Sequence, residues 1–119
     1  MSKSLFEQYG GFSVVSRIVS SFYDRVLESE NLAPYFDGID MRRQIDHQSK
    51  FISSLMGGPA SYTNDQLQRS HARLNINDAD FNEVVQVLTE TFEDAGIKAS
   101  DVSTLVRDIN SRRSIIVTR

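Results

Sequence analysis

The sequence predicts an all-α protein, and three features of the chain support that class. Apolar residues recur at intervals of three and four along most of the chain, which is the spacing of one face of a helix. No segment alternates apolar and polar residues in the way that a half-buried strand requires. Glycine and proline, which end helices, divide the chain into four long helical segments and several short ones.

Two glycines separate the first two predicted helices. The opening segment spans Ser4 to Tyr9 and ends at Gly10-Gly11. In the segment that follows, apolar residues come in pairs every four positions, so its apolar arc is wide enough to contact more than one neighbour. These residues are Val14, Val15, Ile18, Val19, Phe22, Tyr23, Val26 and Leu27.

A proline and a glycine mark residues 31–40 as a loop or short turns, with Tyr35-Phe36 pointing inward. Asp40 is the expected N-cap of a helix from Met41 to Met56, because its side-chain oxygen would accept a hydrogen bond from the unpaired N–H groups of the first turn. Gly57-Gly58-Pro59 then ends this helix.

The next segment is expected to be a loop over residues 60–65 and a short helix from Gln66 to Arg73. Asn77 or Asp78 caps the long helix that follows, which ends at Gly96. Its single apolar stripe consists of Phe81, Val84, Val85, Leu88 and Phe92.

The last predicted helix starts at Ser100, and its apolar residues continue to Val117. The chain has 119 residues and no internal repeat. That length is enough for one hydrophobic core but short for two. We therefore expect a single domain, residues 1–119, built from four main helices with short extra helices.

Composition argues against several classes of function. The net charge of −3 speaks against nucleic acid and anionic membranes as partners, since both favour a clustered basic surface. The chain has no cysteine, which excludes disulfides, thiolate metal sites and cysteine nucleophiles. No apolar run approaches the length that crosses a membrane, and the N-terminus lacks a signal-peptide pattern, so we expect a cytoplasmic protein.

Two glutamines lie on the predicted buried face of the helix from Met41 to Met56. At about 100° per residue, Gln44 and Gln48 fall inside its apolar arc, and His47 falls at the rim. A buried amide without a partner costs about 1–3 kcal/mol, so the glutamines either pair inside the protein or face a polar ligand. The helix alone leaves both readings open. Tyr23, near the edge of the earlier apolar arc, adds a hydroxyl that would point into the same space.

The other histidine, His71, shares a helical face with Leu67 and Leu74. A single histidine on an apolar face is more often a structural residue than a metal ligand. His47 and His71 alone are too few for a structural zinc site. Two histidines suffice, however, where a macrocycle already supplies four nitrogens to the metal.

Several short motifs occur in a specific order along the whole chain. They are Leu5-Phe6 before Gly10-Gly11, the segment Phe22 to Val26, Pro34-Tyr35-Phe36, Gly38 to Met41, Gln44, Phe51, Gly57-Gly58-Pro59, Tyr62 and His71-Ala72. In this order and at these spacings, the chain resembles a truncated haemoglobin of the first (N-type) group over essentially its full length.

The resemblance implies a 2-on-2 globin sandwich, in which two pairs of helices cross around a b-type haem. His71 is then the proximal iron ligand. Tyr23, Gln44 and Gln48 are implied to lie on the distal side, where they donate hydrogen bonds to a diatomic ligand and carry any catalysis. On this interpretation the polar groups on the buried face serve a polar ligand.

The resemblance also implies which residues surround the cofactor. The expected cofactor contacts are Phe36, Arg43, His47, Lys50, Phe51, Tyr62, Leu67, His71, Leu74 and Phe81. Further candidates for the apolar walls are Phe22, Ile52, Val85, Leu88 and Ile116. Arg43 or Lys50 on one side and Arg73 on the other would pair with the haem propionates. A third histidine, which some relatives attach covalently to a vinyl group, is absent, so non-covalent binding is expected.

His47 has two readings. In some family members a histidine at the matching position becomes a second axial ligand when no gas is bound. The alternative is a solvent-facing histidine near a propionate. The sequence leaves both open, because the reach of the side chain depends on how the helix is placed.

The implied activity is reversible binding of O₂, NO and CO at a ferrous haem in a monomer. Redox chemistry is implied as well, either NO dioxygenation to nitrate or a peroxidase-like reaction, with an unidentified reductase as partner. A cofactor-free helical interaction module is the alternative that the same amphipathic helices allow. A haem-based gas sensor is disfavoured, because no output domain accompanies the globin pattern.

Overall fold

A computed structural model describes residues 4–58 and 76–117 of the chain. Within these ranges the backbone is helical, and its one β interaction is an isolated parallel bridge between Ile76 and Val117. The helices are α1 (Leu5–Tyr9), α2 (Phe12–Glu28), the 3₁₀ helix η1 (Ala33–Phe36), α3 (Met41–Leu55), α5 (Asp78–Asp94), α6 (Ala99–Asn110) and α7 (Arg113–Ile116).

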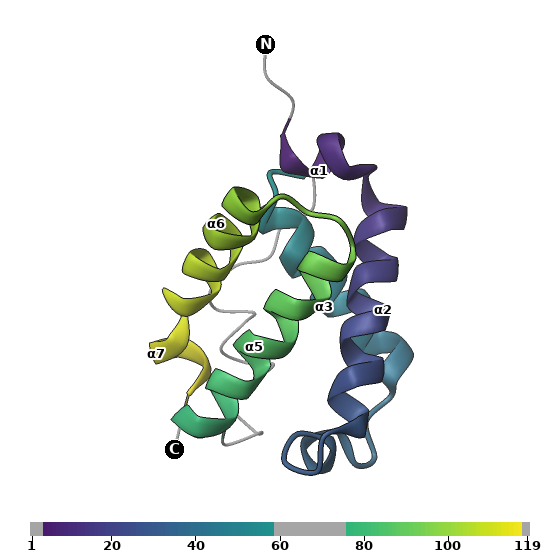
Figure 1. Cartoon of the computed structure of the whole chain (residues 1–119). Helices are drawn as coiled ribbons and strands as arrows, with labels where there is room; N and C mark the ends of the chain where they lie inside the picture. Colours follow the sequence, from purple (N-terminus) through teal and green to yellow (C-terminus); the bar gives the residue numbers. More distant parts are fainter. Residues whose placement is uncertain (1–3, 59–75, 118–119) are drawn as a thin grey trace.

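The long helices form two pairs that pack against each other (Figure 1). Helix α2 packs along α3, and α5 packs along α6. The pairs meet chiefly where α2 crosses α5. Helix α2 is central because its wide apolar arc is buried on both sides, as the sequence predicted. Its buried residues are Val15, Ile18, Val19, Phe22, Tyr23 and Val26.

The boundary between α1 and α2 lies at the predicted glycine pair. Ser4 caps α1, because its Oγ accepts a hydrogen bond from the backbone N–H of Glu7 at 3.2 Å. Gly10 has a φ of 114°, which side-chain-bearing residues rarely adopt. A Cβ at Gly10 would also lie 2.6 Å from the side chain of Val14, so both the backbone and the packing require glycine here.

Helix α3 starts where the sequence predicted. The carboxylate of Asp40 accepts hydrogen bonds from the backbone N–H groups of Arg42 and Arg43, at 3.1 and 3.4 Å. The helix ends at Leu55, and Gly57 follows with a φ of 82°.

The cap of α5 is Asn77 rather than Asp78. The Asn77 side chain accepts a hydrogen bond from the backbone N–H of Asp80 at 2.8 Å, which resolves the two alternatives. Helix α5 ends at Asp94, two residues before Gly96, whose φ is 86°.

The prediction of one uninterrupted last helix was wrong. Helix α6 begins at Ala99 and ends at Asn110, and the separate short helix α7 follows. Beyond α6 the backbone N–H of Arg112 bonds to Ile109, three residues back, instead of to Asp108. The Asp108 carbonyl accepts from the side chains of Ser111 and Arg112 instead, at 2.6 and 2.8 Å. These side chains thus bond the carbonyl that the backbone N–H of Arg112 leaves without a helical partner.

Helix length and hydropathy bear on a membrane role. Within residues 4–58 and 76–117, no helix combines the length and the apolar character needed to cross a bilayer.

Candidate functional site

A largely apolar pocket lies between the two helix pairs. Its volume is about 590 Å³ including the space at its mouth, which is within the size range of cofactor sites. The lining residues are Phe22, Tyr23, Val26, Phe36, Gln44, Gln48, Phe51, Ile76, Phe81, Val84, Leu88, Ile109 and Ile116. They come from α2, η1, α3, α5, α6 and α7 and, for Ile76, from the residues just before α5, so the pocket exists only when both pairs are assembled.

Three polar side chains interrupt this lining: Tyr23, Gln44 and Gln48. Gln44 donates a hydrogen bond from Nε2 to the Tyr23 hydroxyl oxygen at 3.1 Å. Tyr23 is buried, while Gln44 and Gln48 are half-buried. A tyrosine hydroxyl can donate one hydrogen bond as well as accept, so accepting from Gln44 does not use its donor.

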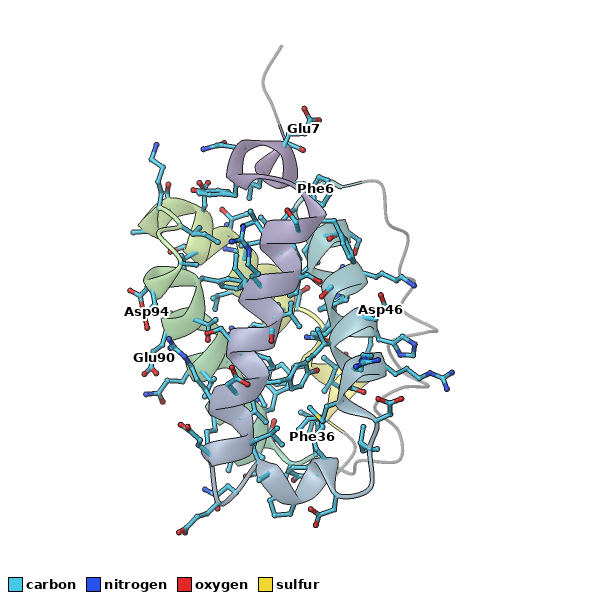
Figure 2. The ribbon with its side chains drawn as sticks, turned by 90° about the vertical axis from the view of Figure 1, so that its right-hand side faces the viewer. Phe6, Glu7, Phe36, Asp46, Glu90 and Asp94 are labelled. Carbon is cyan, nitrogen blue, oxygen red and sulfur yellow. The ribbon has the colours of Figure 1, made fainter. Side chains whose placement is uncertain are left out.

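Aromatic contacts fix the ring of Tyr23. The ring of Phe22 lies 4.9 Å from it and the ring of Phe36 lies 5.5 Å from it, both in edge-to-face geometry. Such contacts favour one ring orientation. Phe36 comes from η1, which Figure 2 shows beside the ends of α2 and α3. This short helix therefore helps to aim the Tyr23 hydroxyl at α3.

The inner face of α3 carries its pocket residues at helical spacing. Gln44, Gln48 and Phe51 all line the pocket, as the wheel projection predicted for the two glutamines. Of these residues, Gln44 donates to the Tyr23 hydroxyl, which connects α3 to α2.

The outer side of α3 carries three other predicted site residues. Arg43 and Lys50 are exposed, and His47 is half-buried and is not among the pocket-lining residues. Lys50 forms an ion pair with Asp46 at 3.0 Å, and Figure 2 shows Asp46 on the side of α3 that faces away from the other helices. The structure therefore brings none of the three into the pocket.

Most of the expected wall residues line the pocket. Phe22, Phe36, Phe51, Phe81, Leu88 and Ile116 do so. Ile52 and Val85 do not: Ile52 is fully buried in the helix-packing core, and Val85 is half-buried against that core. Each follows a pocket-lining residue on its helix and is therefore rotated about 100° away from it.

Four lining residues were not predicted: Val26, Ile76, Val84 and Ile109. Val26 and Val84 lie about one turn from the predicted wall residues Phe22 and Phe81, so helical spacing could have identified them. Ile76 reaches the pocket beside Ile116, whose neighbour Val117 forms the β-bridge with Ile76, and no local pattern indicates that pairing.

Several predicted site residues lie outside the described residues. They are Tyr62, Leu67, His71, Arg73 and Leu74. Within residues 4–58 and 76–117, no group of three or more His, Asp or Glu side chains is arranged to hold a metal ion.

The described lining is chemically suited to a flat apolar cofactor with a small polar ligand beside it. Four phenylalanine rings and six aliphatic side chains provide apolar walls. The polar donors come from the two neighbouring helices α2 and α3, and Tyr23 and Gln44 are hydrogen-bonded to each other. This composition fits the haem that the motif order implied.

Comparison with known sequences gives consistent matches. The family model of bacterial-like globins matches residues 4–117. The group 1 truncated haemoglobin GlbN of a Nostoc species is 25% identical over 98% of each chain. GlbN of Mycolicibacterium paratuberculosis is 30% identical, over 87% of this chain and 76% of the relative.

Solved structures match over the whole length. The 2/2 haemoglobin of a Synechococcus species, in the cyanomet state with covalently attached haem, gives a TM-score of 0.89 at 24% identity, covering 98% of this chain and 100% of that one. The Fe(III) truncated haemoglobin of Tetrahymena pyriformis gives a TM-score of 0.87 at 24% identity, with the same coverage. Solved variants of the Tetrahymena protein are substituted at a tyrosine and at two glutamines, 21 and 25 positions after that tyrosine.

Proposed function

The chain belongs to the bacterial-like globin family, among the group 1 truncated haemoglobins with the 2-on-2 fold, and on that basis we propose that its pocket binds a non-covalent b-type haem that takes O₂, NO and CO. The predictions of family and fold class are confirmed. Membership makes the protein a haem globin, and the finer function is argued from the pocket residues.

The observation that carries the proposal is the hydrogen-bonded pair of Tyr23 and Gln44 in an otherwise apolar pocket. When bound, haem supplies the iron to which the gas binds and the electron for redox chemistry. Gln44 donates to the Tyr23 hydroxyl oxygen, and we propose that the Tyr23 hydroxyl in turn donates to the gas. A donor fixed in an apolar cavity stabilises charge on such a ligand more strongly than water does.

Gln48 is the proposed second donor. It lies one helical turn after Gln44 and lines the same pocket. The intervals from Tyr23 to Gln44 and Gln48 equal the 21 and 25 positions between the substituted tyrosine and glutamines of the Tetrahymena protein. These matching intervals support equivalent places in the two proteins.

The apolar walls have their own proposed role. Phe22, Phe36 and Phe51 exclude water from the space beside Tyr23, which slows proton delivery to a bound gas and so slows its loss as superoxide. The chain has only two histidines and no third one to attach the cofactor, which supports non-covalent binding in contrast to the Synechococcus protein.

The remaining cofactor contacts stay proposals. His71 is the proposed proximal ligand, flanked by Leu67 and Leu74. Arg43 and Lys50 are exposed on α3 and remain candidates for the propionates. Lys50 would exchange its ion pair with Asp46 for that contact.

His47 is proposed as a residue that would bind the cofactor iron, in addition to His71, in the gas-free protein. It is half-buried beside Gln48 but does not line the pocket, so ligation requires a rotation or shift of α3. We therefore expect ligation by His47 to compete with gas binding and to depend on the freedom of α3.

A redox reaction is also proposed for the same site. Conversion of NO and O₂ to nitrate consumes one electron, which an external reductase must restore, and peroxidase-like chemistry has the same need for a reductant. The apolar pocket with fixed donors suits either reaction. Repeated NO consumption in the presence of O₂ and an added reductant, compared between the native chain and Tyr23→Phe, separates a dioxygenase from a simple gas carrier.

An absorption spectrum of the haem-reconstituted protein tests the proposal. We expect a Soret band that is lost in His71→Ala, and ferric low-spin bands that are lost in His47→Ala. Persistence of the low-spin bands in His47→Ala would refute His47 as a ligand. A chain that stays colourless in the presence of excess haemin would favour the cofactor-free interaction module instead.

A further inference from the structure

Two adjacent arginines at the junction of α6 and α7 each place the guanidinium over an aromatic ring of the pocket, in cation-π contact. The guanidinium carbon of Arg112 lies 5.6 Å from the ring centroid of Phe51, and that of Arg113 lies 4.6 Å from the ring centroid of Phe81. Both rings line the pocket, but neither arginine does. Phe51 belongs to α3 and Phe81 to α5, so the two contacts reach both helix pairs.

The guanidinium of Arg113 is held in place by hydrogen bonds. Its Nη1 donates to Asp78 at 2.9 Å, and its Nη2 donates to Asn82 at 2.6 Å and to Asn110 at 3.3 Å. These partners lie in the first turns of α5 and at the end of α6. A planar guanidinium fixed by several acceptors is a rigid surface for a ring to stack on.

Arg112 is anchored at the other side of the junction. Its Nη1 donates to the carbonyl of Asp108 at 2.8 Å, in the last turn of α6. This carbonyl lies at the break between α6 and α7, where the backbone N–H of Arg112 bonds to Ile109 instead. The interruption of the helix and the contact with Phe51 therefore involve one side chain.

The segment that follows the arginines also reaches the pocket. Ile116 lines it, and Val117 forms the parallel bridge to Ile76, another lining residue. Ile76 is five positions after His71 in the sequence. The placement of α7 therefore fixes pocket walls on more than one element.

We propose that Arg112 and Arg113 form a bracket across the two helix pairs that fixes the rings of Phe51 and Phe81, and with them the width and the haem orientation of the pocket. This inference rests on the proposed haem function. Both arginines act through the rings and are therefore positioning residues. A role in surface charge alone would not require either guanidinium to lie over a ring. A guanidinium held over a ring restricts the orientation of that ring.

Haem loss from the reconstituted ferric protein to excess apomyoglobin tests the bracket. We expect Arg113→Ala to lose haem about tenfold faster, a factor equivalent to about 1.4 kcal/mol, and Arg112→Ala to lose it several-fold faster. In the cyanide-bound ferric protein, we expect proton NMR to show a second set of haem methyl signals in both variants, because the haem populates a second orientation.

Two controls separate this role from charge and from general stability. Arg107→Ala removes a positive charge from the exposed surface of α6. Tyr9→Phe removes the 2.6 Å hydrogen bond to Asp101 at the other end of the molecule, between α1 and the start of α6. Both variants should keep the native haem-loss rate within about twofold and a single set of methyl signals.

Arg113→Lys distinguishes stacking from charge. Lysine keeps the ion pair with Asp78 but has no planar group, so we expect the fast haem loss to persist. Recovery of the native rate by lysine would refute the bracket, as would native rates in both alanine variants. Arg112 makes fewer hydrogen bonds than Arg113. Arg112→Ala therefore still tests the bracket if Arg113→Ala does not fold. A native chain that binds no haem would instead refute the proposed function itself.

Discussion

One hydrogen bond to Tyr23 gives the two glutamines of α3 different proposed roles. Both glutamines of α3 line the pocket, yet Gln44 is the one that donates to the Tyr23 hydroxyl. Gln44 therefore acts mainly through Tyr23, by holding its oxygen, whereas the Tyr23 hydroxyl is the proposed donor to the gas. Substitutions at the two positions should then be coupled rather than additive.

Tyr23→Phe should increase the O₂ dissociation rate about 10- to 100-fold, because a hydrogen bond to a partly charged acceptor contributes about 1.5–3 kcal/mol. Gln44→Leu should have a smaller effect in the native chain and almost none in the Tyr23→Phe background. Stopped-flow displacement of O₂ by CO measures all four rates of this cycle. Tyr35→Phe is the matched control, because the Tyr35 hydroxyl bonds to Asp80 and does not line the pocket. Additive effects at Tyr23 and Gln44 would contradict their coupling.

At the scale of single elements, the N-cap of α3 lies one turn before a pocket residue. Asp40 accepts hydrogen bonds from two backbone N–H groups of the first turn, at 3.1 and 3.4 Å. Gln44 follows in the next turn, where its backbone N–H bonds to the Asp40 carbonyl at 3.0 Å. The cap thus connects the stability of α3 to the position of a pocket residue.

Asp40→Ala should lower the free energy of unfolding by about 1 kcal/mol, the usual cost of removing an N-cap side chain. Asp40→Asn keeps a side-chain oxygen for the cap and should cost only a few tenths of a kcal/mol. Urea unfolding followed by circular dichroism measures both values. Equal losses in the two variants would mean that the carboxylate charge, rather than the cap, stabilises the helix.

Across the whole molecule, α1 connects the two helix pairs although it is only five residues long. The backbone N–H of Phe6 donates to the carbonyl of Met56, just after α3, at 2.9 Å. The Tyr9 hydroxyl donates to Asp101 at 2.6 Å and accepts from the backbone N–H of Lys98 at 3.1 Å, at the start of α6. Figure 1 shows α1 at the end of the molecule where α6 begins, away from α7.

These contacts predict a loss of stability at alkaline pH. The hydrogen bond to Asp101 raises the pKa of Tyr9 above its usual value of 10.0, with burial of the ring as a smaller cause. A phenol whose pKa is raised by folding stabilises the protein fully below pH 10, and this contribution is lost as the pH rises through the folded-state pKa.

The stability difference between the native chain and Tyr9→Phe should therefore be constant from pH 7 to about pH 9 and should shrink above about pH 10. Urea unfolding at a series of pH values measures this difference. A difference that stays unchanged up to about pH 11 would show that Tyr9 does not titrate through this contact.

Much of the fold could be predicted because its signals are local. Asp40 and Asn77 are caps that satisfy N–H groups two and three residues away, and Gly10 and Gly57 have backbone angles that glycine adopts readily. Helical spacing also placed Gln44 and Gln48 on an inward face, since the rotation per residue is fixed within a helix. The order of the short motifs also predicted the family and, through the family, the fold.

The tertiary structure decided everything that depends on distances between elements. It paired Gln44 with Tyr23, left His47 out of the pocket lining, and joined Ile76 to Val117. The physical reason is that periodicity records which side of a helix faces inward, whereas the residue it meets there depends on how the helices cross, and packing of the whole core sets that crossing.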